Sequence, residues 1–363
     1  MKCRIAQDTR TGKRPYNQDR LGHWRSPEAV LVVVADGMGG HAHGEVAAEV
    51  VVGHFGAEFE RAAKPRLADP DLFLYRCIAR AHALLRRAAR ERGLGAVPRT
   101  TVAACVVQDG RAYWSHVGDS RFYLIRAGKV AARTRDHTRV QQLLDAGEIG
   151  EEEAGAHPER NVLSQCLGGP APPRVEPAAA AVLERGDVLL LCSDGLWGAL
   201  PQEALAEGLL AGDLDAALPR LVSEAERRAG ARCDNISALA LSWEEEAQPE
   251  AGAEASPPQD PDRDLENAIE NIRRALRERG REALDLVLES GDADAESEYL
   301  RMTDEDVGRE IARIRDALRR RDPPPPTAAD GGGADEEYLR VTDEDIEREI
   351  ARIRAAFRKQ AGS

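Results

Sequence analysis

The sequence predicts an α+β domain built on an antiparallel sheet with flanking helices, followed by a tail of short helical repeats. Three observations support this class. First, apolar runs of strand length alternate with segments of helical periodicity. Second, these segments do not follow the regular strand, helix, strand spacing of a Rossmann-type fold, and third, the composition becomes acidic and proline-rich after Trp243. We therefore expect a domain over residues 1–243, a linker over 244–262 and a tail over 263–363.

Strands are expected where buried apolar runs occur, at residues 30–35, 102–107, 122–125, 188–192 and 236–241. Helical periodicity covers Asp71–Arg92 and Leu214–Arg228. Residues 113–130 predict two strands around Gly118-Asp119 and a turn at Ala127-Gly128. The apolar runs are far shorter than a membrane span, and the first residues lack the apolar stretch of a secretory signal, so we expect no membrane association and a cytoplasmic location.

The tail contains an internal repeat. EYLRMTDEDVGREIARIRDALRR at 298–320 returns 39 residues later as EYLRVTDEDIEREIARIRAAFRK, and a degenerate copy of the helical part begins at residue 262. Threonine caps, acidic first turns and arginine-rich last turns predict helices over about 262–279, 298–321 and 337–359. Each close copy has a narrow apolar stripe. Two interpretations stay open, a module that docks a partner or self-associates and a solvated tail without such a role.

The formal net charge of −14 comes entirely from the tail. From Glu244 onward there are 33 acidic and 19 basic residues, which leaves 31 of each in residues 1–243. This distribution argues against nucleic acid or an anionic membrane as the partner, because both would need a basic face. The six cysteines are scattered without a CxxC spacing, which is typical of reduced, buried thiols and argues against a zinc cluster or a disulfide framework.

Five aspartates are predicted to lie where strands meet loops. Asp36 and Asp194 each end an apolar run and precede a glycine, while Asp119 follows a glycine between two expected strands. Asp234 stands just before the last strand, and Asp19 lies in a loop ahead of the first apolar run. A lone Asp-Gly pair is an ordinary turn, but five such positions allow side chains of different strands to converge.

Converging carboxylates repel one another unless cations lie between them. An oxygen-rich ligand set without paired histidine or cysteine favours Mg²⁺ or Mn²⁺ over Zn²⁺, and a pair of such ions suits the hydrolysis of phosphate esters. Gly37 has no Cβ, so its carbonyl can approach an ion that Asp36 also binds. Arg14 precedes Asp19 by five residues and is the candidate for binding phosphate oxygens with its planar guanidinium.

Eight motifs occur in order along residues 1–243: RPYNQDR, VVADGMGGH, TTVAACVV, VGDSRFYLIR, RDHT, NVLSQCLGG, LLLCSDGLWGAL and CDNISALAL. Together they resemble the metal-dependent Ser/Thr protein phosphatases of type 2C in their bacterial form. The resemblance implies a sandwich of two antiparallel sheets flanked by helices on both sides, with two metal ions at one end. It also implies hydrolysis of phosphoserine and phosphothreonine by a metal-activated water, and phosphoprotein partners such as a Ser/Thr protein kinase or its substrates.

The same resemblance implies metal-binding roles for six residues: Asp19, Asp36, Gly37, Asp119, Asp194 and Asp234. Asp36 would bridge two Mn²⁺ or Mg²⁺ ions, with the Gly37 carbonyl on one of them. Asp194 and Asp234 would hold the second ion and Asp19 the first, directly or through water. Asp119 would serve a weaker third ion. Arg14 would bind the substrate phosphate and act in catalysis beside Asp36.

Four residues depart from the family's pattern: Gln18, Met38, Arg99 and Gly198. Gln18 replaces a glutamate of many relatives, Gly198 replaces an aspartate that would support the third ion, and Arg99 stands where glycine is usual. Met38 replaces the histidine that some members use as a general acid. Solvent, or one of the nearby histidines at positions 41 and 43, would then protonate the leaving oxygen.

Residues 139–169, after the Asp-His-Thr motif, correspond to the family's variable flap, for which we expect mobility and a share in substrate choice. Three hypotheses for function follow. The first is a phosphatase that depends on Asp36. The second is a phosphatase-fold pseudoenzyme that acts as a sensor or scaffold through its tail, as the loss of the carboxylate at Gly198 would suggest. The third is another two-metal hydrolase such as a nuclease, which the neutral domain disfavours.

Overall fold

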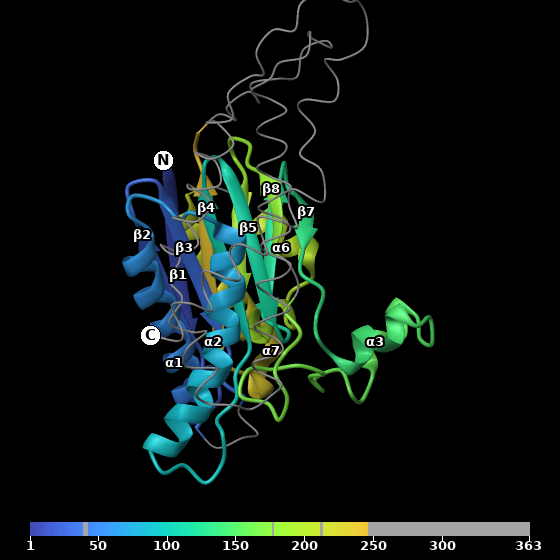
Figure 1. Cartoon of the computed structure of the whole chain (residues 1–363). Coiled ribbons are helices and arrows are strands. Elements are labelled where there is room, and N and C mark those ends of the chain that lie inside the picture. The colour runs from blue at the N-terminus through green and yellow to red at the C-terminus, as the bar shows by residue number, and fades with distance from the viewer. Residues whose placement is uncertain (39–42, 176–177, 211–212, 246–363) are drawn as a thin grey trace, which may run out of the picture. The chain divides into compact units, whose positions relative to one another are not determined.

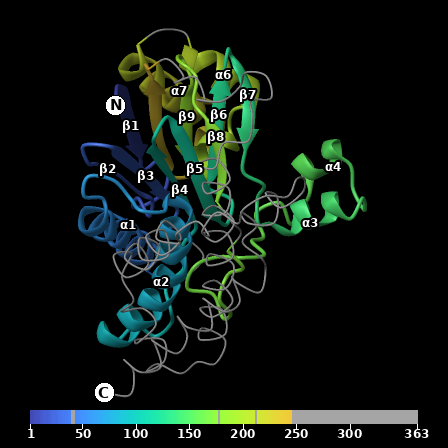
Figure 2. The same cartoon turned by 45° about the horizontal axis from the view of Figure 1, so that its top comes forward.

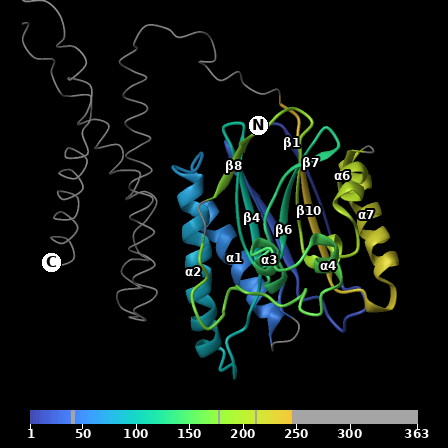
Figure 3. The ribbon, with the colours of Figure 1, turned by 90° about the vertical axis from the view of Figure 1, so that its right-hand side faces the viewer.

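The structure is a computed structural model, and it describes residues 1–38, 43–175, 178–210 and 213–245 (Figure 1). Two five-stranded antiparallel sheets pack face to face, and helices cover the outer face of each sheet (Figure 3). The predicted class of two antiparallel sheets with flanking helices is confirmed over these residues. The predicted linker beyond residue 245 and the three predicted tail helices lie outside the described residues.

The first sheet has the strand order β1 (Cys3–Arg10), β10 (Ile236–Trp243), β9 (Val188–Cys192), β6 (Arg121–Arg126) and β7 (Lys129–Arg133). The second has the order β2 (Arg20–Arg25), β3 (Ala29–Ala35), β4 (Val102–Gln108), β5 (Arg111–Val117) and β8 (Ala179–Val182). The longer helices are α1 (Gly44–Ala62), α2 (Pro70–Glu91), α6 (Gln202–Leu210) and α7 (Leu214–Ala229). The connections contain α3 (Arg139–Asp145), α4 (Glu151–Ala156), α5 (Asp194–Trp197) and the 3-10 turn η1 (Gly230–Arg232).

The apolar strand β3 is buried at every position because it is covered on both faces. Leu31 and Val33 pack against α1 and α2, whereas Val32 and Val34 face the other sheet. The strands β4 and β9 are likewise buried throughout. Continuous apolar runs are common in parallel sheets, but here they arise from burial on both sides of an antiparallel sandwich.

Three apolar layers hold the four structural layers together. One lies between the second sheet and the helices α1 and α2, a second between the first sheet and α6 and α7, and a third between the two sheets. In the third layer, Trp114 of β5 stacks on Phe122 of β6, with ring centroids 4.4 Å apart. This contact joins the two sheets across the turn that carries Asp119.

The helices α3 and α4 lie to one side of the sandwich (Figure 2) and form the first part of the predicted flap. Thr138 caps α3 by accepting a hydrogen bond from the Gln141 amide at 3.1 Å. Within the described residues, no helix has both the length and the apolar composition needed to cross a membrane. All six cysteines are free thiols, and four of them are buried.

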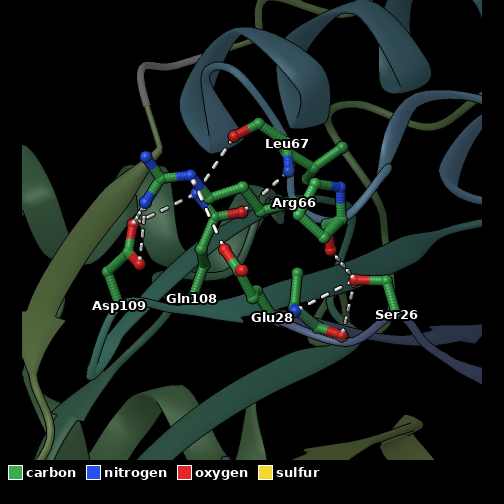
Figure 4. A network of polar contacts seen from close by, with 8 residues as sticks. Ser26, Glu28, Arg66, Leu67, Gln108 and Asp109 are labelled. Atoms are coloured by element: carbon green, nitrogen blue, oxygen red, sulfur yellow. Dashed lines mark hydrogen bonds and ion pairs between the residues drawn. The ribbon is translucent and has the colours of Figure 1, made fainter.

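A polar network ties the loop between α1 and α2 to the far end of β4 (Figure 4). The Gln108 side chain is 4% exposed; it accepts from the Leu67 amide at 2.9 Å and donates to the Leu67 carbonyl at 3.0 Å. The neighbouring Arg66–Asp109 ion pair, at 3.1 Å, joins two side chains that are each 53% exposed. The network therefore contains one buried and one solvated interaction.

The two interactions predict different effects on stability. Gln108→Ala leaves both Leu67 backbone groups unpaired in a buried place, so the free energy of unfolding in urea should fall by about 2–4 kcal/mol. Arg66→Gln, the matched control, should change it by less than about 1 kcal/mol because solvent screens the exposed pair. Equal losses in the two variants would contradict this division of the network.

Candidate metal centre

Five carboxylates come together at one end of the sandwich. Asp19 precedes β2, Asp36 follows β3 and Asp119 lies between β5 and β6. Asp194 follows β9, and Asp234 precedes β10. Asp36 interacts electrostatically with the other four carboxylates, so side chains that are up to about 200 positions apart in the sequence share one region.

The backbone of Asp36 is fixed by the start of β4. Its carbonyl accepts from the Thr101 amide at 2.9 Å and from the Thr100 hydroxyl at 2.8 Å, and its amide donates to the Thr101 hydroxyl at 3.1 Å. Gly37 forms a bridge with Thr100, and a Cβ at this position would overlap the Gly44 carbonyl. Only glycine fits the turn that follows Asp36.

Asp19 has one bonded and one unbonded carboxylate oxygen. The Ser193 hydroxyl donates to its Oδ2 at 2.8 Å, and the same hydroxyl accepts from the Ser237 amide at 3.0 Å. Its Oδ1 is buried without a hydrogen-bond partner in the described part of the chain. Such an atom is costly in a protein interior unless a proton or a cation satisfies it.

Burial and mutual repulsion raise the pKa values of four of these carboxylates, those of Asp19, Asp36, Asp119 and Asp194. Desolvation is the largest cause, and it raises the pKa of Asp19 to about 7 and that of Asp194 to about 6. For Asp36 and Asp119 the pKa is raised well above the ordinary value, again through burial and then through neighbouring carboxylates. The Asp36 and Asp194 side chains also share a hydrogen bond. Burial therefore favours the protonated form of these four carboxylates.

Arg14 lies beside this group, in the loop between β1 and β2. Its Nη2 donates to Asp234 Oδ2 at 2.6 Å, and its side chain is 51% exposed. Asn235 holds the loop in place, because its Nδ2 donates to the carbonyls of Thr11 and Tyr16 at 2.8 and 3.1 Å. A half-exposed guanidinium next to the carboxylates can receive an anion from solvent.

Asp119 is 7% exposed and sits in a network that includes a cation–π contact. The Trp197 indole donates to the Asp119 carbonyl at 2.9 Å, and the Arg121 guanidinium lies 3.5 Å from the centroid of the Trp197 ring. Arg121 also makes a two-point hydrogen bond to Asp136, at 2.7 and 2.6 Å. The network links the turn of Asp119 to α5 and to the start of the flap.

The residues that depart from the family pattern have defined places. Gln18 is 7% exposed, and its Nε2 donates to Glu45 at 3.2 Å, so it does not face solvent as a free amide. His43 precedes α1 with a left-handed backbone conformation, and its Nδ1 is 3.9 Å from Glu45 Oε1. His41 lies outside the described residues. Gly198 is exposed at the end of α5.

The donor set fits hard divalent cations. It consists of five carboxylates, four of which have raised pKa values, and Asp19 has an unpaired buried oxygen; all of these groups are oxygen ligands. Within the described ranges, no group of three histidine, cysteine, aspartate or glutamate side chains is arranged so that it could hold a metal ion without some movement. Asp234 is engaged by Arg14 and by the Asn235 amide at 2.8 Å, so its carboxylate would have to turn in order to reach an ion shared with Asp36.

The residues that support these carboxylates carry little signal in the sequence. Ser193 and Asn235 directly adjoin Asp194 and Asp234, so adjacency to a candidate aspartate was the available signal. Thr101 also lies in a motif, but nothing in the sequence connects it to Asp36, which is 65 positions away.

The arrangement of sheets, helices and acidic end is that of a metal-dependent phosphatase. The model of the family described as "Protein phosphatase 2C" matches residues 8–221, more than half of the chain. The chain belongs to this family. A putative 2C-type phosphatase of Streptococcus pyogenes is 33% identical over 240 residues, which cover 64% of this chain and 94% of that protein.

Solved structures agree with this assignment. The serine/threonine phosphatase Stp1 of Staphylococcus aureus is similar with a TM-score of 0.63 and 27% identity, over 68% of this chain and 96% of that one. The catalytic domain of a phosphatase named PstP, in complex with two manganese ions, is similar with a TM-score of 0.57 and 29% identity, over 67% and 99% of the two chains.

The raised pKa of Asp36 makes the free energy of unfolding depend on pH. Because the folded-state pKa lies above the unfolded value of 3.8, ionisation of this group costs stability as the pH rises from about 4 toward the folded pKa. In a chelating buffer, Asp36→Asn should therefore raise the free energy of unfolding at pH 7.5 and change it much less at pH 4.5.

Adding Mn²⁺ should make the wild type more stable than Asp36→Asn, because an ion bound only by the folded wild-type chain stabilises it. Urea unfolding at both pH values, with and without the ion, measures the effect. A variant that is less stable than the wild type in the chelating buffer at pH 7.5 would show that repulsion at Asp36 is not the dominant force.

Proposed function

We propose that this chain hydrolyses phosphoserine and phosphothreonine in protein substrates, with two Mn²⁺ or Mg²⁺ ions held at the acidic end of the sandwich. The observation that carries the proposal is the position of Asp36, which interacts with four other buried or half-buried carboxylates and lies near the guanidinium of Arg14. The similarity to PstP, whose catalytic domain binds two manganese ions, supports the number of ions and favours manganese.

In this proposal Asp36 would contribute to both ions, with the Gly37 carbonyl on one of them. Asp194 and Asp234 would hold the second ion and Asp19 the first, directly or through water. When bound, the ions lower the pKa of an attacking water and neutralise charge on the phosphoryl oxygens. The products are the free Ser or Thr hydroxyl and inorganic phosphate.

Arg14 binds and orients the phosphoryl group. Its present partner is Asp234 at 2.6 Å, and a phosphoryl oxygen can replace that carboxylate as the acceptor once Asp234 turns to a cation. Met38 has no proton to give, so we assign protonation of the leaving oxygen to solvent. Asp119 is the candidate ligand of a third ion. Binding of that ion would be weak because Gly198 offers no second carboxylate.

The wider organisation follows the sequence. Residues 1–243 form the phosphatase domain, 244–262 the linker and 263–363 the tail with its repeats. A cytoplasmic location and a Ser/Thr protein kinase, or its substrates, as partners suit an enzyme that reverses protein phosphorylation. No observation favours the pseudoenzyme alternative, in which the chain would act as a scaffold only.

Activity on a phosphothreonine peptide tests the proposal. Release of phosphate should require Mn²⁺ or Mg²⁺ and stop with EDTA, and Asp36→Asn or Asp194→Asn should lower kcat by roughly 10²–10⁴-fold. Asp109→Asn, an exposed aspartate at the far end of β4, is the matched control and should retain wild-type kcat. Metal-loaded wild-type protein that releases no phosphate would favour the pseudoenzyme.

The tail repeats give a second test in the full chain. Ile314→Ser together with Ile353→Ser interrupts the apolar stripe of both close copies. We expect the variant to keep its phosphatase activity but to lose either its oligomeric mass in light scattering or its capture of a cognate Ser/Thr kinase. An unchanged mass and unchanged capture would favour the solvated tail.

A further inference from the structure

A cavity of about 490 Å³ lies at the C-terminal end of α2, where the chain leaves the helix and leads to β4. Its walls come from α2, from the loop that leads to β4 and from residues 168–170 at the end of the flap. The cavity includes three arginines, Arg86, Arg90 and Arg99, and no residue that lines it is acidic. Its volume is in the range of pockets that hold small ligands.

The cavity is joined to the centre through backbone contacts. The Met38 amide donates to the Arg99 carbonyl at 3.1 Å, and the next residue, Thr100, bonds the Asp36 carbonyl through its hydroxyl. On its other side, Thr100 exchanges two backbone hydrogen bonds with Leu167, at 3.2 and 2.9 Å. Arg99 therefore stands two residues from Thr101 in a segment that is hydrogen-bonded to both the centre and the end of the flap.

The walls are held rigidly. Gly168 has a φ of +76°, and a Cβ there would overlap the Pro98 carbonyl, so the two segments are in close contact. The Gly168 amide donates to Nδ1 of the buried His82 at 3.3 Å, and Arg86 Nη2 donates to the Pro170 carbonyl at 2.8 Å. A pocket held in this way does not need to be ordered by its ligand.

The charges of the cavity are available to a ligand. Among the described residues, neither Arg90 nor Arg99 forms an ion pair with a carboxylate, and Arg90 is exposed. By contrast Arg87, on the neighbouring surface of α2, is paired with Glu91 at 2.7 Å and does not line the cavity. Unpaired guanidinium groups around a concave surface favour carboxylate or phosphate, which they bind through paired hydrogen bonds.

We propose that this cavity is a specificity subsite that binds a second anionic residue of the substrate, a carboxylate or a second phosphoryl group near the phosphorylated residue. The proposal rests on the proposed phosphatase function. It also gives a role to Arg99, which stands where the resembling family usually has glycine. Substrates with an acidic residue or a second phosphorylation at the right spacing would be dephosphorylated in preference to neutral ones.

The test uses the full chain and a set of phosphothreonine peptides of equal length. One position, two to five residues from the phosphothreonine on either side, is Ala, Glu or phosphoserine. We expect the best anionic peptide to exceed its Ala counterpart in kcat/KM by about tenfold, mainly through KM, and the Glu and phosphoserine arms identify which anion is preferred. The preference should weaken as the salt concentration rises.

Arg90→Gln and Arg99→Gln should each reduce the anionic-to-neutral ratio toward one, and Arg87→Gln should retain it. A wild-type ratio near one at every position, or an equal loss in Arg87→Gln, would overturn the subsite. If the two pocket variants instead raise kcat/KM equally for neutral and anionic peptides, the cavity holds an acidic segment of this chain, and the substrate proposal is wrong.

Fluorescence anisotropy with the same peptides tests the subsite separately from the proposed phosphatase function, because it measures binding without turnover. Absence of phosphate release from every peptide would contradict the proposed function, while a Kd for the anionic peptide equal to that for the neutral one would overturn the subsite alone. Tighter binding of the anionic peptide that Arg99→Gln abolishes would support the subsite in either case.

Discussion

Mutual repulsion among five carboxylates at one end of a well-packed sandwich determines the electrostatics of the metal centre. Each carboxylate is at least partly removed from water. In the protein interior like charges repel one another far more strongly than in bulk solvent. The raised pKa values of Asp19, Asp36, Asp119 and Asp194 express this cost, because burial and neighbouring carboxylates disfavour the charged form. The folded chain retains this unfavourable group because the surrounding backbone is held by other forces. Binding of divalent cations would reduce this repulsion between the carboxylates.

Those other forces have two sources. The strands that end at Asp36 and Asp194 are β3 and β9, which are buried at every position, so their ends cannot splay without exposing apolar surface on two faces. Hydrogen bonds then fix the loops: the hydroxyls of Thr101 and Ser193 bond the backbone of Asp36 and the carboxylate of Asp19. A carboxylate on a rigid strand end cannot relax away from its neighbours, and this rigidity keeps the ligands close together before any ion binds.

The parts of the fold that were predictable are those with one unambiguous local signal. β3, β4 and β9 were identified because burial on both faces leaves no polar residue to obscure the run, and the aspartates stood out because they end such runs abruptly. The strands β1 and β2 were not specified, because many of their residues are only half-buried and their polar positions resemble a loop. The helix α1 was also missed, since its small and β-branched residues give little amphipathic contrast. Supporting residues such as Thr101 could not be found, because their partners lie many tens of positions away and only the sheet register brings them together.

The charge distribution within residues 1–243 is not visible in their sum. These residues are neutral in total, which argues against nucleic acid as a partner, but they contain both an acidic centre and a cavity with three arginines. A phosphate dianion approaching the carboxylates alone would be repelled, so a cationic neighbourhood is needed as well as the ions themselves. Because salt screens exposed charges beyond about 10 Å, the arginines act on groups held close to them rather than on distant partners. When a second anion is on the same peptide as the phosphorylated residue, the peptide keeps it within that range of the arginines. The positively charged cavity can therefore discriminate between substrates that present the same phosphoryl group to the same centre.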